Sequence, residues 1–172
     1  MPQPIIIVDY DPGWPKLFEE LRTPVASVLG SLALAIEHVG STSVPFLAAK
    51  PIIDMDVVVE STSHISSAIE RLATLGYLHK GNLGIPGREA FLWPPSTPCH
   101  HLYVCPRDSV ALQRHLSFRN YLIKHPDEAH RYGLLKRKLA VKFRNDREAY
   151  TNAKDEYIQA IIDLGLQDVR TT

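Results

Sequence analysis

The segment Ile52–Val59, which reads IIDMDVVV, constrains the fold of this chain more than any other because it sets two carboxylates in an apolar strand. Side chains alternate between two faces in an extended strand, so Asp54 and Asp56 share one face and the intervening apolar residues take the other. Two carboxylates close together on a half-buried surface repel each other and lose solvation unless a cation, a basic side chain or bound protons compensate. The segment therefore predicts a central sheet strand with one face that needs a positive partner.

The length of the chain predicts one domain. Its 172 residues, 45% of them hydrophobic, are enough to bury a core of ordinary size. There is no internal repeat, low-complexity tract or linker composition that would divide it. We therefore expect a single domain over residues 1–172, in which a sheet-bearing core (1–106) is packed against a helical segment (107–172).

The charge balance excludes one class of function. Formal net charge is zero, which is not the strong basic bias of a protein dedicated to duplex nucleic acid. The charges are unevenly placed, with 6 Lys and Arg against 10 Asp and Glu in residues 1–106, and 13 against 9 in residues 107–172. The basic half can supply counter-charge to the acidic half or to an anionic ligand, and two oppositely charged solvated faces would give the same pattern.

The cysteines and the N-terminal residues indicate the cellular compartment of the protein. Cys99 and Cys105 have a spacing that is not typical of a zinc site, and two cysteines do not make a disulfide scaffold. The sequence from Met1 to Pro15 has no positively charged n-region, and no apolar window approaches the length of a membrane span. We expect a cytoplasmic protein in a reducing compartment, with no membrane partner.

Periodicity predicts a sheet-bearing half followed by helices. Apolar residues recur at helical spacing from Trp14 to Val28, where Pro24 is expected to kink or divide the helix. A second helix is expected from Ser61 to a stop at Gly76. Strands are expected at residues 32–39 and 51–59, a hairpin at residues 88–93 and 100–105, and long helices after Asp108.

A Gly-Ser turn follows the first of these strands. Backbone N–H groups at Gly40 and Ser41, with the hydroxyls of Ser41, Thr42 and Ser43, can hold phosphate oxygens, although many such turns bind nothing. Twelve residues later comes the Asp-x-Asp strand, and the combined pattern resembles the nucleotidyltransferase superfamily that includes DNA polymerase beta. In that chemistry two carboxylates on one strand face hold Mg²⁺ ions that position a nucleoside triphosphate for in-line phosphoryl transfer.

Most of the chain is similar to the GrpB family. The similarity is carried by the segments YDPGWPKLFEEL, IEHVGSTSVP, LAAKPIIDMDVVV, GIPGRE, HHLYV, FRNYLIKHP, and LKRKLA through DREAYTNAK. The resemblance implies a nucleotidyltransferase-like fold and a link to dephospho-coenzyme A kinase, to which family members are sometimes fused. This sequence departs from the family pattern at Phe46, in place of a glycine, at Tyr103, in place of a histidine, and at Asn120, in place of an aspartate. Phe46 is expected to alter the shape of its loop, and the other two the polar site.

The superfamily's third carboxylate has no clear counterpart on the expected last strand. His101 and Tyr103 occupy one face there, which allows either a mixed aspartate–histidine metal site or a binding pocket without transferase activity. Glu89 is a second candidate for the third acid, although a charge on the surface of the hairpin is the simpler interpretation. The other candidates are His38 as a pocket residue, and Lys50 and Arg88 as phosphate ligands, each with solvated or core alternatives.

The sequence thus predicts an α/β (α+β) fold of the nucleotidyltransferase type, with a mixed sheet, flanking helices and a C-terminal helical segment. The predicted function is metal-dependent binding of a nucleotide or another phosphorylated small molecule, with Asp54 and Asp56 binding Mg²⁺ or Mn²⁺. If the protein is an enzyme, it is a nucleotidyltransferase with Asp54, Asp56 and His101 in the catalytic site. The alternative is a non-catalytic nucleotide-binding, anion-binding or partner module that retains the fold, for example one linked to coenzyme A biosynthesis.

Overall fold

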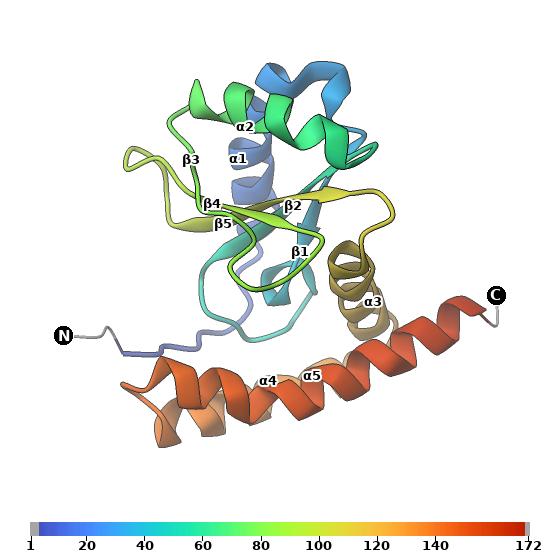
Figure 1. Ribbon diagram of the computed structural model, residues 1–172. Helices are drawn as coiled ribbons and strands as arrows, with labels where there is room; N and C mark the ends of the chain where they lie inside the picture. Colours follow the sequence, from blue (N-terminus) through green and yellow to red (C-terminus); the bar gives the residue numbers. More distant parts are fainter. Residues whose placement is uncertain (1–3, 171–172) are drawn as a thin grey trace. The chain divides into compact units, whose positions relative to one another are not determined.

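The apolar Asp-x-Asp segment forms an inner strand of a five-stranded sheet in the computed structural model, which describes residues 4–170 (Figure 1). The strand order is β1-β2-β5-β4-β3. Strand bounds are β1 (Ala35–Val39), β2 (Ile53–Val59), β3 (Leu78–His79), β4 (Glu89–Leu92) and β5 (His100–Pro106). β2 pairs with β5 in parallel, and the other neighbours are antiparallel. The predicted α/β class with a mixed sheet is confirmed.

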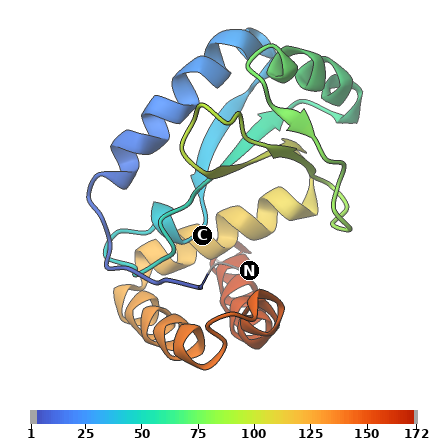
Figure 2. The ribbon, with the colours of Figure 1, turned by 90° about the vertical axis from the view of Figure 1, so that its left-hand side faces the viewer.

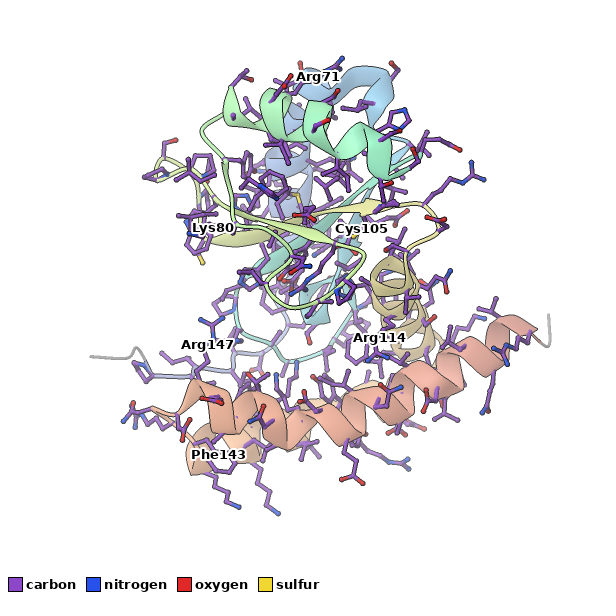
Figure 3. The ribbon with its side chains drawn as sticks, viewed as in Figure 1. Arg71, Lys80, Cys105, Arg114, Phe143 and Arg147 are labelled. Carbon is purple, nitrogen blue, oxygen red and sulfur yellow. The ribbon has the colours of Figure 1, made fainter. Side chains whose placement is uncertain are left out.

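Two helices cover one face of the sheet, as Figures 1 and 2 both show. α1 (Trp14–Leu29) and α2 (Ile65–Ala73) pack against each other and against the central strands. Met55 and Val57 of β2 are fully buried on this side. The guanidinium of Arg71, labelled in Figure 3, donates from α2 to the carbonyl oxygen of Leu29 at 2.6 Å, which satisfies an acceptor at the end of α1.

Several boundaries differ from those that the sequence predicts. Pro24 lies inside α1 without dividing it. Residues 30–32 form a short 3-10 helix, η1 (Gly30–Leu32), so β1 starts later than expected. A second short 3-10 helix, η3 (Thr62–His64), precedes α2. β2 begins two residues after Pro51, since proline has no N–H for the ladder. The hairpin of β4 and β5 is confirmed, whereas the two-residue strand β3 was not anticipated.

The chain divides into two compact units. Unit 2 consists of residues 13–39 and 52–114 and contains the whole sheet with α1 and α2. Unit 1 is assembled from three separate segments, which within the described residues are 4–12, 40–51 and 115–170. The expectation that residues 1–172 form one domain, with segment 107–172 packed on 1–106, stays a prediction.

Unit 1 is helical, as the periodicity of the C-terminal segment predicts. Its helices are the part of α3 (Val110–Lys124) from His115 onward, α4 (Pro126–Lys142) and α5 (Arg147–Arg170). Asp146 caps α5 by accepting the N–H of Ala149 at 2.9 Å. Loop 40–51 packs against these helices through Val44 and Leu47, each 1% exposed. An isolated antiparallel bridge pairs Val8 of the N-terminal segment with Ala49 of this loop.

Among the helices of residues 4–170, none is both long enough and apolar enough to cross a membrane.

Candidate functional site

The predicted carboxylate face is built by the parallel pairing of β2 and β5. Asp54 lies opposite His101 and Asp56 opposite Tyr103 in the register of the two strands. Cross-strand neighbours share a face, so the four side chains lie on the same side of the sheet, opposite α1 and α2. Asp54 is half-buried, while Asp56 is completely buried. The structure thus brings together the four residues that the sequence assigns to this face.

A short hydrogen bond joins His101 to Asp54. His101 Nδ1 and Asp54 Oδ1 are 2.7 Å apart, and their side chains are 29% and 27% exposed. An ionised carboxylate can only accept, so the Nδ1–H group donates and Nε2 remains as the second nitrogen of the ring. Within residues 4–170, no three His, Cys, Asp or Glu side chains are arranged to hold one metal ion. His101 therefore orients Asp54 in this structure, and the donor set on this face is carboxylate oxygen, which suits Mg²⁺ or Mn²⁺.

Arg88, just before β4, lies over the same face. Its guanidinium carbon is 4.2 Å from the centre of the Tyr103 ring, and it also hydrogen-bonds to the side chain of Tyr103. Its Nε is buried and has no hydrogen-bond partner among the described residues. Burial raises the pKa of Tyr103, and the charges of Asp54 and Asp56 raise it further. Arg88 has the opposite, lowering effect. Tyr103 is therefore a neutral hydroxyl near neutral pH.

Cys105 completes the β5 side of this face. Burial raises the pKa of its thiol to about 12, and the charge of Asp56 contributes to the rise. A hydrogen bond with Ser109 has the opposite, lowering effect. The residue is fully buried, and Figure 3 labels it on its strand. Because metal ligation and nucleophilic attack require the thiolate, Cys105 has a packing role here.

Glu37 is a residue of this face that the sequence analysis missed. It lies opposite Asp56 in the antiparallel register of β1 and β2 and is partly buried. The alternation of residues 35–39 sets Glu37 and Val39 on one face, but only the pairing with β2 shows which face that is. Glu37 thus adds a third carboxylate to the face of Asp54 and Asp56.

His38, which the sequence offers as a pocket candidate, is not part of this face. It lies opposite Met55, on the side of the sheet that α1 covers. Its ring stacks on that of Phe18 in α1, with 4.7 Å between the centroids and 8° between the planes. Glu89, the other candidate for the third acid, accepts from His79 Nε2 at 2.6 Å and lies opposite Val104, one position out of step with Tyr103. The positions of His38 and Glu89 off this face result from the same strand alternation that brings Asp54 and Asp56 together.

The predicted phosphate-binding residues other than Arg88 all belong to unit 1. Gly40 has a φ of 71°, which glycine adopts without strain, and leads into a 3-10 turn, η2 (Ser41–Ser43). The Ser43 hydroxyl donates to the carbonyl of Gly40, and Ser41 is hydrogen-bonded to Tyr132 of α4. Thr42 is 1% exposed.

Lys50 lies at the other end of the same loop. Its ammonium nitrogen is 5.8 Å from the centre of the Tyr150 ring in α5. Arg88 thus lies on the carboxylate face of unit 2, whereas Ser41 and Lys50 contact tyrosines of unit 1.

Comparison with known proteins gives the family. The model of the GrpB family, described as "GrpB protein", matches residues 4–164. The crystal structure of the conserved protein GrpB from Enterococcus faecalis superposes with a TM-score of 0.86 at 36% identity, over 95% of this chain and 99% of that one. Glutamate-rich protein GrpB of Alkalihalophilus pseudofirmus is 33% identical over 92% of this chain and 94% of its own length.

Two longer proteins match over part of their length. YqkA of Bacillus subtilis is 39% identical over 89% of this chain, which spans 45% of YqkA. A dephospho-CoA kinase of Mycolicibacterium paratuberculosis is 35% identical over 77 residues, which are 43% of this chain and 19% of the kinase. With a family match over residues 4–164 and a relative of nearly the same length, the chain belongs to the GrpB protein family.

Proposed function

We propose that the carboxylate face of unit 2 binds a divalent cation, Mg²⁺ or Mn²⁺, through Asp54 and Asp56, and that the protein uses the cation to bind a nucleotide or another phosphorylated small molecule. The observation that carries the proposal is the pairing of β2, which sets Asp54 and Asp56 on one face with Glu37 beside Asp56. Two carboxylates on one strand face supply the oxygen ligands that a hard divalent cation prefers. The guanidinium of Arg88 lies over the same face, next to Tyr103.

The donor set fits a hard cation. Carboxylate oxygens are the ligands that Mg²⁺ and Mn²⁺ prefer, and the protonated thiol of Cys105 and the Asp54-directed Nδ1 of His101 do not add soft or nitrogen ligands. When bound, such a cation polarises phosphoryl oxygens and neutralises charge that develops on them. The contribution of the chain is to orient Asp54 through His101 and to hold the Arg88 guanidinium, with its unpartnered Nε, over Tyr103.

The enzymatic form of the proposal is a nucleotidyltransferase. In it the second nitrogen of His101, fixed by the hydrogen bond to Asp54, is placed to accept a proton from an acceptor hydroxyl. The second candidate is a binding module without turnover, possessing the fold but not a third carboxylate on β5. The observation in its favour is that His101 and Tyr103 occupy the positions next to the aspartates.

The relatives bear on partners and location within the same proposal. The similarity of 77 residues to a dephospho-CoA kinase supports a functional link to such a kinase, acting with it on a nucleotide-containing ligand. We place the protein in the cytoplasm, a location supported by cysteines that are free in both the exposed and the buried position.

Calorimetric titration with Mn²⁺ tests the metal site. Asp54→Asn and Asp56→Asn are expected to weaken binding at least tenfold, because each removes a charged ligand. Glu60→Gln is the matched control: it removes an exposed carboxylate just after β2, whose partner is Arg107. Unchanged affinity in both aspartate variants would sink the metal proposal. A large loss of metal-free stability in them would instead assign the aspartates to internal ion pairs.

Turnover separates the enzyme from the module. Labelled nucleoside triphosphates with Mg²⁺ or Mn²⁺ and a panel of acceptors are expected to yield pyrophosphate with the wild type and none with Asp54→Ala. Thermal stabilisation by nucleotide that needs Asp54, without pyrophosphate release across the panel, would support the module.

A further inference from the structure

The carboxylate face of unit 2 continues past β5 to the edge of the sheet. Ala90 of β4 lies opposite Tyr103, and strand alternation places Leu92 on the same face as Ala90. Leu78 of β3 lies opposite Leu92. We call Leu78 and Leu92 the leucine pair. Because β3 is the last strand of the sheet, the leucine pair forms the outer end of the face that carries the two aspartates.

The leucine pair lies in one row with the proposed metal ligand Asp54. Asp54 is opposite His101, and the register of β4 with β5, continued by one residue, brings Leu92 beside His101. Neighbouring strands are about 4.8 Å apart, so Leu92 lies about 10 Å and Leu78 about 14 Å from Asp54 across the sheet. A ligand that extends from Asp54 across His101 therefore meets the leucine pair next.

The leucine pair faces solvent. Leu78 is 60% and Leu92 40% exposed, whereas Phe91, which points to the helix-covered face, is buried. Single exposed leucines are common on protein surfaces. The outermost strands of a sheet, however, usually carry charged side chains, because an apolar edge invites association. Two adjacent leucines at this edge leave an apolar surface for a ligand to cover.

Lys80, labelled in Figure 3, adds a hydrogen-bond donor to the same edge. Its backbone N–H donates to the carbonyl oxygen of Ala90 at 2.8 Å, which extends the pairing of β3 with β4 by one residue. Lys80 follows Leu78 by two positions and so shares its face. The side chain is exposed, and its ammonium group carries three N–H donors. The edge thus combines an apolar surface with a polar, positively charged border.

A nucleobase matches both features of this edge. Its ring has flat faces that can cover apolar side chains, and oxygen and nitrogen acceptors lie around its rim. A hydrocarbon chain would cover the leucine pair but would offer no acceptor to Lys80. A sugar would offer acceptors but less apolar surface. The combination favours a heteroaromatic ring over either of these groups.

We infer that the leucine pair is the subsite for the nucleobase of a nucleotide whose phosphate chain lies at Asp54. The inference rests on the proposed function for the phosphate end of the ligand, and it narrows that function from phosphorylated small molecules in general to nucleotides. The base lies against Leu92 and Leu78, and the ammonium group of Lys80 donates to an acceptor at its rim. The subsite consists of residues of unit 2.

Calorimetric titration of the full chain with ATP and with inorganic triphosphate, both with Mn²⁺, tests the subsite. The ratio of the two affinities isolates the contribution of the nucleoside. ATP is expected to bind the wild type at least tenfold more tightly than triphosphate. Leu92→Thr and Leu78→Thr are each expected to reduce this ratio about fivefold, because each removes apolar surface that the base covers. Threonine preserves the preference for a strand.

Matched variants separate the subsite from general surface effects. Leu34→Thr is the control for an exposed leucine, since Leu34 is 52% exposed and directly precedes β1, the strand at the other edge of the sheet. Lys80→Gln is expected to lower the ratio about threefold, and Lys16→Gln on α1 to leave it unchanged. Melting curves establish that each variant is folded. An equal loss in the control variants, or no gain of ATP over triphosphate in the wild type, would overturn the inference.

Octyl phosphate tests the rival occupant, a hydrocarbon chain. Its affinity with Mn²⁺ is compared with that of inorganic phosphate in the wild type and in Leu92→Thr. A gain from the octyl group that depends on Leu92, with no gain of ATP over triphosphate, would assign the leucine pair to a hydrocarbon and refute the nucleobase.

The leucine pair and the metal site can fail separately. Asp54→Asn is expected to weaken ATP and triphosphate alike and to keep their ratio, whereas Leu92→Thr changes the ratio alone. If triphosphate binding needs Asp54 and Mn²⁺ but the ratio is the same in the wild type and the leucine variants, the metal site stands and the subsite is excluded. If ATP binding depends on Leu92 and is the same in Mn²⁺, in EDTA and in Asp54→Asn, the subsite stands and the metal site falls.

Discussion

Replacement of Gly165 by alanine tests how closely α5 approaches α3 within unit 1. A Cβ built on Gly165 would lie 2.6 Å from the carbonyl oxygen of Ser117 and 3.1 Å from its carbonyl carbon. Ordinary carbon–oxygen contacts between helices lie at about 3.3 to 3.6 Å. The obstructing atom is backbone, so it cannot rotate away. The two helices would have to separate by roughly 0.7 Å at this point to admit the methyl group.

Two opposing effects set the size of the change. Alanine favours a helix interior over glycine by about 1 kcal/mol. Overpacking of a close contact costs about 1 to 3 kcal/mol, and a clash with a rigid carbonyl group belongs in the upper part of that range. We therefore expect Gly165→Ala to lower the free energy of unfolding by about 1 to 2 kcal/mol.

Gly133 in α4 provides a control of opposite sign. A Cβ there would meet the Leu47 and Ala48 side chains at 3.6 and 3.7 Å, which is ordinary van der Waals contact. Gly133→Ala is expected to raise the free energy of unfolding by about 0.5 to 1 kcal/mol, the helix propensity alone. Urea unfolding followed by circular dichroism compares the two at equal m-values. The reasoning is refuted if Gly165→Ala proves as stable as Gly133→Ala.

Two further predictions concern other positions. Phe46 has a φ of 65° and is 88% exposed. Phe46→Gly should relieve left-handed backbone strain and stabilise unit 1 by up to about 1 kcal/mol. A loss of stability in urea would show that the contact of the Phe46 ring with Tyr10 matters more than the strain. His100 is fully buried, with Nδ1 donating to Pro98 and Nε2 accepting from Tyr77. Burial lowers the pKa of His100 below the ordinary 6.5, so the unfolded chain binds the proton more tightly than the folded chain. The contribution of neutral His100 to the free energy of unfolding is therefore fully present above pH 6.5. It falls as the pH drops toward the folded-state pKa. The pH profile of unfolding should accordingly be flatter in His100→Gln than in the wild type below pH 6.5, and parallel profiles would contradict this.

The sequence predicts the carboxylate face well because that face depends on strand periodicity. Alternation along residues 52–59 and 100–105 is local, and it places Asp54 and Asp56 together and His101 with Tyr103. The same rule fails for pairing partners, which depend on contacts between distant segments. Glu37 and Asp54 could not be assigned to one face without the register of β1 with β2, and only this register shows that His38 lies on the opposite face.

Burial in the C-terminal helices shows a different limit. Tyr150 and Lys136 look like ordinary residues of amphipathic helices, yet they are 0% and 3% exposed. Helical periodicity predicts burial only for the apolar stripe. Phe46 stands where the family pattern has a glycine, and the sequence predicts that it alters the loop. In the structure Phe46 has a φ of 65°, in the left-handed region where glycine is usual. The altered loop stays a prediction.

The three-part construction of unit 1 has a consequence for the order of events during synthesis. Val44 and Leu47 are buried by residues such as Leu122 and Ile161 of the helices. At about 5 to 20 residues per second, the chain between Leu47 and Ile161 takes on the order of ten seconds to emerge from a ribosome. All strands of unit 2 are synthesised by residue 114, before most of these helices exist. A nascent chain paused there would carry every strand of its sheet and an apolar loop still open to chaperones.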